Sequence, residues 1–294
     1  MNSIDVPAEV RDGSLAVVAS VSGGKDSTAL ILALREAEIP ARYVFADTQW
    51  EAAETYAYLD TLREVLGITI DVVGVEGGMV GRAAYRAGFP ARMQRWCTRE
   101  LKIEPLRKYH DALGVETANA VGIRADESAA RAKMADWELE EGPRTWNGWV
   151  WRPLLRWTVA DVLAIHHRHG VPVNPLYRQG FSRVGCFPCI FAQKEEIRLL
   201  AETHPERIDY VERVEAEVQA IRDARNVETP GRYTHAQAVF FQTRDRVAPQ
   251  GIRSVVEWAR TDRGGRQLPL LAPAPTGGCM RWGLCDTGEV VRDG

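Results

Sequence analysis

The sequence has no long apolar run, no internal repeat and no marked excess of one charge. Nowhere in its 294 residues do about eighteen apolar residues follow one another, so no membrane-spanning helix is expected. The first thirteen residues carry acids and lack an apolar stretch, which argues against a secretory signal peptide. Lysine and arginine total 37 against 40 aspartates and glutamates, so the general positive field of non-specific nucleic-acid binders is missing. Any anionic partner should therefore be bound locally.

Cysteine is also scarce. Five cysteines, an odd number in a chain without a secretory signal, do not suggest a disulfide framework, so we expect a reducing, cytoplasmic location. In that setting a cysteine often serves as a metal ligand or a nucleophile. The remaining composition, 45% hydrophobic and 26% charged, is that of an ordinary globular protein.

The first half of the chain alternates strand and helix patterns. Apolar, β-branched runs predict strands at residues 15–21, 42–46, 68–73 and 118–123, and helical spacing predicts helices at 27–38 and 51–66. Strands separated by helices of this length form a parallel sheet through right-handed crossovers. We therefore expect an α/β, Rossmann-like domain over residues 1–195, with helices on both faces of the sheet and ligands at the carboxyl ends of its strands.

The second half has helical and irregular patterns. A capping-box pattern at Thr158 predicts a helix that ends near Arg168. Three histidines are expected at the surface or the end of that helix: His166, His167 and His169. Further helical patterns cover residues 194–226, interrupted at Pro205, and then 236–246 and 252–260. Residues 196–294 are thus predicted to form a helical and irregular C-terminal extension.

Six residues connect the first predicted strand to the first helix: Ser22, Gly23, Gly24, Lys25, Asp26 and Ser27. Glycines allow a tight turn and a close approach of backbone N–H groups to an anion, and the helix N-terminus adds positive partial charge. The Walker pattern does not apply, because no glycine stands four residues ahead of a Gly-Lys pair. A plain turn would explain the glycines but not the crowding of Lys, Asp and hydroxyl groups. We therefore interpret the segment as a phosphate-binding loop.

This loop resembles the PP-loop of the adenine nucleotide alpha-hydrolase-like proteins, which split ATP between its α and β phosphates on a parallel sheet of this kind. The resemblance implies that the six loop residues bind phosphate and that Lys25 and Asp26 act in catalysis. It also places Asp47, just after the second predicted strand, on the ribose or base side of the nucleotide.

Further segments resemble the phosphoadenosine and adenosine phosphosulfate reductase family. They follow the family's order between residue 15 and about residue 195: 45–50 (FADTQW), 96–102 (WCTRELK), 121–131 (beginning VGIRADES), 151–154 (WRPL), 174–177 (NPLY) and 185–189 (GCFPC). Six ordered segments are far more specific than any one of them. Arg124 and Arg131, in the third segment, are candidates for contacts to phosphate or sulfate.

Two departures from that family bear on the expected reaction. Reductases that act on an activated sulfate usually lack the lysine of the loop, whereas Lys25 is present here, where it would stabilise a departing pyrophosphate. The Cys-Gly-Ile/Leu-His ending of the reductases is absent, and Cys285 is followed by an aspartate. Both departures favour an ATP-consuming sulfur-transfer enzyme, similar to the branch that contains the DNA phosphorothioation protein DndC.

The resemblance also bears on the cysteines. Adenosine phosphosulfate reductases hold a [4Fe–4S] cluster with a Cys-Cys pair and a CxxC motif, and Cys97, Cys186 and Cys189 map onto three of these four positions. Cys285 or Cys279 would supply the fourth thiolate, or one iron would stay open for sulfide. The alternative is a structural zinc ion held by the CxxC motif and the two tail cysteines, which leaves Cys97 as a free thiol.

A strongly basic segment surrounds Cys97. Residues 82–109 contain eight basic side chains and two acids, a local charge of +6. Such a run is usually a solvated helix face. Its position around a candidate ligand cysteine makes an anion-binding role for part of it the better interpretation.

These observations predict an enzyme that binds ATP with Mg²⁺, adenylates an oxygen of an unidentified sulfur acceptor and replaces that oxygen with sulfur. Two alternatives stay open: a phosphosulfate reductase with Cys285 as its nucleophile, and a non-catalytic nucleotide-binding component with a structural zinc. Nucleic acid would be bound only through a partner protein or the local basic rim. No membrane partner is expected, and a homodimer is compatible with the sequence.

Overall fold

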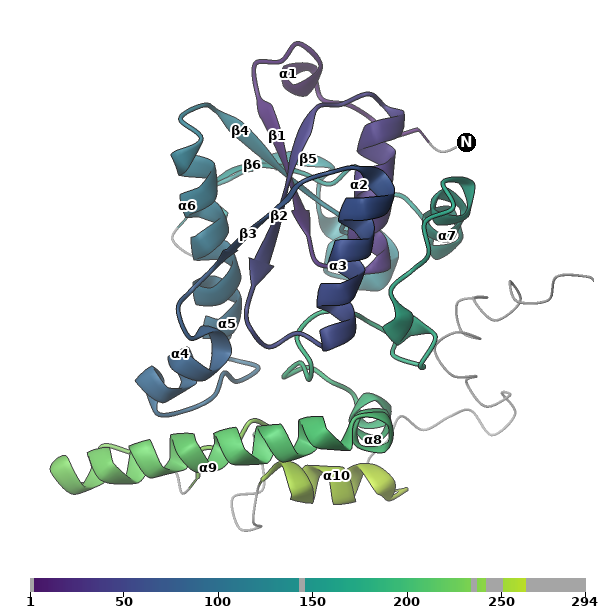
Figure 1. The fold of residues 1–294 in the computed structure, drawn as a ribbon. Helices are drawn as coiled ribbons and strands as arrows, with labels where there is room; N and C mark the ends of the chain where they lie inside the picture. Colours follow the sequence, from purple (N-terminus) through teal and green to yellow (C-terminus); the bar gives the residue numbers. More distant parts are fainter. Residues whose placement is uncertain (1–2, 143–145, 234–236, 242–250, 263–294) are drawn as a thin grey trace, which may run out of the picture.

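A six-stranded, mostly parallel sheet forms the centre of the protein (Figure 1). The computed structural model describes residues 3–142, 146–233, 237–241 and 251–262. The strands lie in the order β3-β2-β1-β4-β6-β5, and β5 alone is antiparallel to its neighbour. Their bounds are β1 Ala16–Val21, β2 Ala41–Asp47, β3 Ile70–Gly74, β4 Thr117–Val121, β5 Trp137–Glu140 and β6 Gly148–Trp151. The four strands predicted from the sequence are confirmed, and β5 and β6 were not predicted.

Helices cover both faces of the sheet, as predicted (Figure 1). Alternate residues of β1 face opposite ways: Val17 and Ala19 join a core with α2 (Lys25–Glu36), α3 (Ala53–Leu66) and α7 (Val159–Arg168). Val18, between them, packs on the other face with residues that include Leu106 of α6 (Glu104–Ala112). Both sides of the central strand are therefore buried, which explains its nearly continuous apolar sequence.

Shorter elements complete the α/β part of the chain. They are α1 (Ala8–Arg11), α4 (Gly78–Arg86), α5 (Trp96–Thr98), the π-helix Arg99–Ile103 that joins α5 to α6, and three 3₁₀ turns at Ala125–Glu127, Arg131–Lys133 and Pro175–Tyr177. The predicted capping box at the start of α7 is present, because the Thr158 hydroxyl accepts from the Asp161 N–H and the Asp161 carboxylate accepts from the Thr158 N–H.

The C-terminal helices lie below the sheet in the view of Figure 1. They are α8 (Lys194–Thr203), α9 (Pro205–Glu228) and α10 (Ile252–Arg260), with the predicted interruption at Pro205. The helix predicted over 236–246 is wrong for its described part, 237–241, which is not helical. There the N–H groups of Ala238 and Phe240 donate to side chains of α9, Gln219 and Glu215, instead of to helical carbonyls. None of the described helices has both the length and the apolar composition to cross a membrane.

One buried indole joins the C-terminal helices to the sheet. Trp50, which follows β2 and is fully buried, stacks on Phe240 at 5.4 Å between ring centroids and packs on Tyr210 of α9 at 5.6 Å. Its Nε1–H donates to the Pro188 carbonyl at 3.0 Å, and the Arg207 guanidinium lies 4.3 Å above its ring. A single buried cluster therefore contains residues from both sides of the predicted domain boundary at 195/196, and that boundary stays a prediction.

We predict that Trp50→Ala lowers the free energy of unfolding by about 3–5 kcal/mol, because it removes a fully buried aromatic side chain and leaves a cavity. Urea unfolding followed by circular dichroism measures the effect. Trp258→Ala, at a partly exposed position of α10, is the matched control and should cost less than about 1 kcal/mol. Equal losses in the two variants would contradict the central role of Trp50.

Candidate functional site

The segment between β1 and α2 is a tight loop held by its own hydroxyl groups. Gly23 has a φ of +70°, and a Cβ atom there would lie 2.8 Å from Thr55 Cγ2, so only glycine fits. The Ser27 hydroxyl donates to the Gly24 carbonyl at 3.0 Å and accepts from the Ser22 N–H at 3.2 Å. This arrangement places the loop at the N-terminus of a twelve-residue helix, where backbone N–H groups attract anions.

Two buried cations share one carboxylate beside this loop. Lys25 Nζ lies 2.6 Å from Asp26 Oδ2, and Arg124 Nε lies 2.5 Å from Asp26 Oδ1. The side chains of Lys25 and Arg124 are 5% and 2% exposed, so neither charge is well solvated. Arg124 also pairs with the half-exposed Asp126. The structure thus brings together three of the predicted phosphate-site residues, from the ends of two neighbouring strands.

Arg131 is positioned less directly. Its guanidinium pairs with Glu127, whose carboxylate also accepts from the Arg124 backbone N–H at 3.0 Å. Arg131 is therefore linked to Arg124 only through Glu127, and its side chain is partly exposed. Its predicted contact with phosphate or sulfate stays a prediction.

Three side chains that the motif analysis did not assign support the loop from behind. The Tyr177 hydroxyl accepts from the Lys25 backbone N–H at 3.2 Å, and Asn174 Nδ2 donates to the Gly23 carbonyl at 3.0 Å. His166 was expected at a surface, but it is 3% exposed, with its ring nitrogens 2.8 Å from the Lys25 carbonyl and 3.0 Å from the Val171 carbonyl. Burial lowers the pKa of His166. The sequence could not show this, because the contacts join α7 to a loop about 140 residues earlier.

The end of β4 packs closely on the start of α2. A Cβ atom on Gly122 would lie 2.7 Å from the carbonyl oxygen of Asp26 and 3.1 Å from the Ser27 nitrogen, both backbone atoms that cannot move aside. Glycine at this position therefore allows the strand that leads to Arg124 to approach the phosphate loop.

The carboxyl end of β2 carries a hydrogen-bonded network around two carboxylates, the partly buried Asp47 and the buried Glu51. Asp47 Oδ1 accepts from the Gln49 N–H at 2.8 Å and from the Tyr56 hydroxyl at 2.7 Å. Glu51, which is 6% exposed, accepts from the Thr48 hydroxyl at 2.7 Å and from the Trp50 N–H at 3.1 Å. The position of Asp47 at the sheet edge agrees with the predicted nucleotide side, although its contact with ribose or base stays a prediction.

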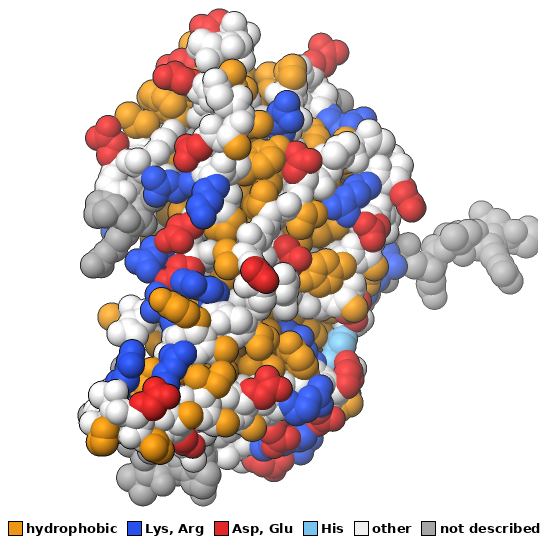
Figure 2. All heavy atoms as spheres, turned by 60° about the vertical axis from the view of Figure 1, so that its left-hand side comes forward, with side chains coloured by type: hydrophobic (Ala, Val, Ile, Leu, Met, Phe, Trp, Pro, Cys, Tyr) orange, Lys and Arg blue, Asp and Glu red, His pale blue; other side chains and the backbone are white. Residues whose placement is uncertain are grey.

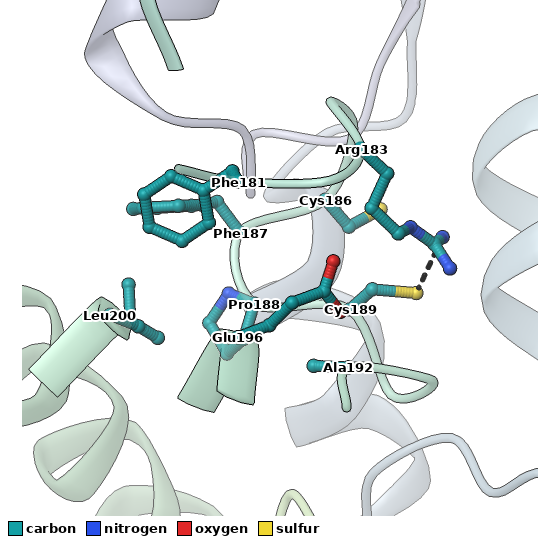
Figure 3. Close-up of a pocket in the computed structure, with 9 residues that line it drawn as sticks. All are labelled: Phe181, Arg183, Cys186, Phe187, Pro188, Cys189, Ala192, Glu196 and Leu200. Carbon is teal, nitrogen blue, oxygen red and sulfur yellow. Dashed lines mark hydrogen bonds between the residues drawn. The ribbon is translucent and has the colours of Figure 1, made fainter. Parts of the chain in front are cut away.

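The CxxC loop lies against this end of β2. Glu51 and Cys186 form an antiparallel bridge, the Phe187 N–H donates to the Trp50 carbonyl at 2.8 Å, and the Thr48 hydroxyl lies 3.9 Å from Cys186 Sγ. The side chains of Cys186, Cys189 and Arg183 extend to the same side of the loop (Figure 3). Beside them is a cavity of about 20 Å³, room for roughly one water molecule.

Three thiols influence one another electrostatically. Burial raises the pKa of Cys97, and the nearby Cys186 and Cys189 add to the rise. Burial also raises the pKa of Cys186, and the charge of Lys102 partly offsets that rise. The charge on Cys186 in turn raises the pKa of Lys102. Arg183 Nη2 donates to Cys189 Sγ at 3.3 Å. The two cations, Lys102 and Arg183, would stabilise thiolates.

Three of the candidate metal ligands lie in the described part of the chain: Cys97, Cys186 and Cys189. Among the described residues, no three His, Cys, Asp or Glu side chains are arranged to hold one metal ion. A four-iron cluster is several atoms across, so its thiolates stand farther apart than the ligands of one zinc ion. Three mutually coupled thiols with Lys102 and Arg183 nearby fit such a cluster in kind and in charge. The proposed fourth ligands, Cys279 and Cys285, lie outside the described residues.

The phosphate loop and the cysteine loop adjoin. A Cβ atom on Gly24 would lie 3.3 Å from the Tyr177 hydroxyl and 3.8 Å from the Cβ of Val184, two residues before Cys186. The loop 22–27 after β1 and the loop 183–189 are therefore neighbours at the carboxyl ends of the strands.

The basic segment divides into paired and unpaired cations. Glu100, 3% exposed, accepts ion pairs from Arg82, Arg86 and Arg99. Burial alone would raise the pKa of Glu100, but hydrogen bonds from these arginines lower it to about 2. The face that includes α4 to α6 shows Lys and Arg side chains in several groups with acidic side chains between them (Figure 2). Part of the +6 run is therefore structural, and only the remainder is free to bind a ligand.

Comparison with known proteins points to one family. The phosphoadenosine phosphosulfate reductase domain matches residues 16–192. An uncharacterised 37.8 kDa protein of Escherichia phage 186 is 35% identical over 87% of this chain and 91% of its own length. The adenosine 5′-phosphosulfate reductase of Allochromatium vinosum is 29% identical over 59% of this chain and 67% of its own. The phosphoadenylyl-sulfate reductase of Candida auris, solved as a phosphate complex, covers 64% of this chain and 99% of its own at 20% identity, with a TM-score of 0.46.

We predict that the Glu100 ion pairs make the protein acid-sensitive. Glu100 ionises near pH 2 in the folded chain against 4.5 in the unfolded one, so its stabilisation is complete above pH 4.5 and is lost as the pH falls toward 2. Glu100→Gln should therefore lower stability at pH 7 and flatten the pH dependence in that window, as measured by urea unfolding at several pH values. Glu104→Gln, at an exposed neighbouring acid, should leave the profile as it is. An unchanged slope in Glu100→Gln would show that these ion pairs do not stabilise the fold.

Proposed function

The chain belongs to the phosphoadenosine phosphosulfate reductase domain family, and on this premise we propose that it is an ATP-consuming sulfur-transfer enzyme. It would split ATP between the α and β phosphates and attach AMP to an oxygen of its acceptor. Sulfide-level sulfur would then form a bond to the acceptor at that position, and AMP would leave with the oxygen. The acceptor is not specified by this proposal.

The observation that carries the proposal is the placement of a lysine-bearing phosphate loop beside three thiols. Gly24 approaches Val184, and Cys186 approaches Thr48 at the end of β2. A nucleotide held by the loop would therefore lie next to sulfur chemistry. A phosphosulfate substrate releases sulfite and needs no charge for departing phosphates, whereas ATP cleaved to AMP releases pyrophosphate, which a buried ammonium stabilises.

The residues of the loop supply binding and charge. The acceptor oxygen would attack the α phosphorus, the bond to the bridging oxygen of the β phosphate would break, and pyrophosphate would leave with both electrons of that bond. Lys25 and the N–H groups at the start of α2 would stabilise the leaving group. Asp26 holds Lys25 and Arg124 in place, so both cations are oriented before the substrate arrives. Mg²⁺ would bridge the phosphates, as is usual in such reactions.

The thiols would hold an iron–sulfur cluster. Cys97, Cys186 and Cys189, with Cys285 or Cys279 as a fourth ligand, would bind it, and Lys102 and Arg183 would offset its negative charge. When bound, the cluster would supply an iron site at which sulfur is held for transfer.

A phosphosulfate reductase is the second candidate, favoured by the relative from Allochromatium vinosum that bears this name. In that reaction a cysteine, Cys285 in the sequence interpretation, would attack the sulfur of the bound phosphosulfate and release the nucleotide. Sulfite formation from adenosine phosphosulfate or its 3′-phosphorylated form with thioredoxin, abolished by Cys285→Ser, would favour this candidate over ATP-dependent transfer.

Lys25→Ala should slow the formation of AMP and pyrophosphate from ATP by about 100-fold to 1,000-fold, with a much smaller change in nucleotide affinity. The reason is that the ammonium stabilises charge that develops as the pyrophosphate leaves. Basal hydrolysis of ATP labelled at the α phosphate measures the rate, and equilibrium binding of a non-hydrolysable ATP analogue measures affinity. Lys108→Ala removes an exposed lysine of α6 and should leave both quantities unchanged. Native rates in Lys25→Ala would refute the adenylation reaction.

Anaerobically purified protein should be brown and carry about four iron and four sulfide per chain. Cys97→Ser and Cys186→Ser should each reduce the iron content, because both thiols would be ligands of one cluster. Visible absorption spectroscopy detects the cluster, and metal analysis measures the iron and zinc content of each variant. Colourless protein with one zinc, kept in Cys97→Ser and lost in Cys279→Ser, would instead support the structural-zinc account.

A further inference from the structure

Three unpaired arginines lie around the cysteine site. We propose that Arg92, Arg95 and Arg183 form a second anion subsite, which binds a phosphate group carried by the sulfur acceptor. This inference rests on the proposed function for the role of the thiols, and it adds the chemical class of the acceptor. The subsite is separate from the Lys25 loop, which would hold the phosphates of ATP.

Two of the arginines share one aromatic ring. The guanidinium carbons of Arg92 and Arg95 lie 5.8 Å and 5.1 Å from the centroid of the Phe191 ring. Phe191 stands two residues after Cys189, in a turn closed by the Ala192 N–H and the Cys189 carbonyl at 2.8 Å. Arg95 in turn stands two residues before Cys97. Both guanidinium groups are therefore tied to segments that carry candidate ligand thiols.

The loop that carries these arginines is ordered by its own backbone. The Ala91 N–H donates to the Gln94 carbonyl at 3.2 Å, the Gln94 N–H donates back to the Ala91 carbonyl at 3.0 Å, and Arg95 Nη2 donates to the Thr98 hydroxyl at 3.3 Å. Its side chains are exposed, including Met93 at 94%. A ligand would thus meet a preformed surface and lose little entropy by ordering it.

Arg183 adds a third guanidinium on the opposite segment. It is exposed, donates to Cys189 Sγ at 3.3 Å, and extends to the same side of the loop as both cysteines of the CxxC motif (Figure 3). If a phosphate group of the acceptor were bound here, the acceptor atoms bonded to that phosphate would therefore lie next to the thiols.

These cations have no acidic partners among the described residues. No carboxylate of the described chain lies within 4.0 Å of the guanidinium groups of Arg92, Arg95 or Arg183, whereas Arg82, Arg86 and Arg99 are all paired with Glu100. Both guanidinium groups of the Arg92 and Arg95 pair lie over the Phe191 ring, so two positive charges stand close to the Cys189 turn without a described carboxylate beside them. The guanidinium fork binds phosphate oxygens in pairs, and a phosphate group offers more negative charge than a carboxylate, so phosphate fits three arginines best.

The phosphate could belong to a small phosphate monoester or to the backbone of a polynucleotide, and two probes distinguish these sources. Fluorescein-labelled oligothymidylate of eight nucleotides represents the polynucleotide, with binding measured by anisotropy. Glycerol 3-phosphate represents the small monoester, with binding measured by calorimetry. Both titrations use the full-length, anaerobically purified protein with a saturating non-hydrolysable ATP analogue, so that the Lys25 loop is already occupied.

We expect Arg92→Gln/Arg95→Gln to weaken binding of the responding probe by at least about tenfold. For the oligonucleotide, the salt dependence of log Kd should become shallower by about 0.7, since the contact with one phosphate is lost. The control is Arg213→Gln/Arg232→Gln, which removes two exposed arginines that also stack on aromatic rings, Tyr210 and Tyr233, and should stay within twofold of the native affinity. Arg92→Lys/Arg95→Lys, which keeps the charge, should retain the salt dependence.

Binding of either probe with this pattern supports the subsite and identifies the source of the phosphate. Binding of neither probe, equal losses in the control, or unchanged affinity in Arg92→Gln/Arg95→Gln overturns it. Urea unfolding of each variant shows whether the fold is kept. Because these are binding measurements without turnover, a native protein that forms no pyrophosphate would refute the proposed function and leave the subsite standing.

Discussion

The pairing of Asp26 with Lys25 and Arg124 is the constraint on which the site depends. Removing two cations from water is costly unless a carboxylate lies between them, and Asp26 is the acid that contacts both. Asp126 contributes less, because its side chain is 45% exposed and its charge is screened. The sheet must therefore bring the end of β4 to the start of α2, which glycine at position 122 allows. The same contacts therefore determine both the conformation of the loop and the position of the end of β4.

The same charge balance suits an anionic substrate. Asp126, the second carboxylate that contacts Arg124, is 45% exposed, so Asp26 does most of the neutralising of the two buried cations, at the N-terminus of a helix that itself attracts anions. A phosphate that approached Lys25 would replace an interaction with Asp26, while Arg124 would keep the carboxylate in place. The loop can thus exchange one anion for another without leaving a charge buried alone, which is the condition for reversible binding at such a site.

Local patterns in the sequence were sufficient for the strands β1 to β4, the tight glycine turn between β1 and α2 and the capped start of α7, because each depends on neighbours within a few residues. The strands β5 and β6 were missed because each is only four residues long and contains a glycine or charged residues. His166 lies in the last turn of α7, at the expected helix end, but its burial was not foreseen, and Tyr177 and Asn174 were not assigned, since the partners of all three lie about 140 residues or more away. The helix predicted at 236–246 failed in its described part because Glu215 and Gln219 compete for its N–H groups.

The basic segment shows why charge counting alone could not define the candidate site. Its eight cations are equivalent in the sequence, but one buried acid, Glu100, holds Arg82, Arg86 and Arg99 at the centre of a structural ion-pair group. The stacking ring for Arg92 and Arg95 comes from Phe191, about one hundred residues later, so their common position is a property of the fold. A cation whose charge is already neutralised adds little attraction for a ligand, whereas an unpaired one contributes its full field. In the proposed second anion subsite, selectivity would therefore depend on which arginines Glu100 leaves without an acidic partner in the described part of the chain.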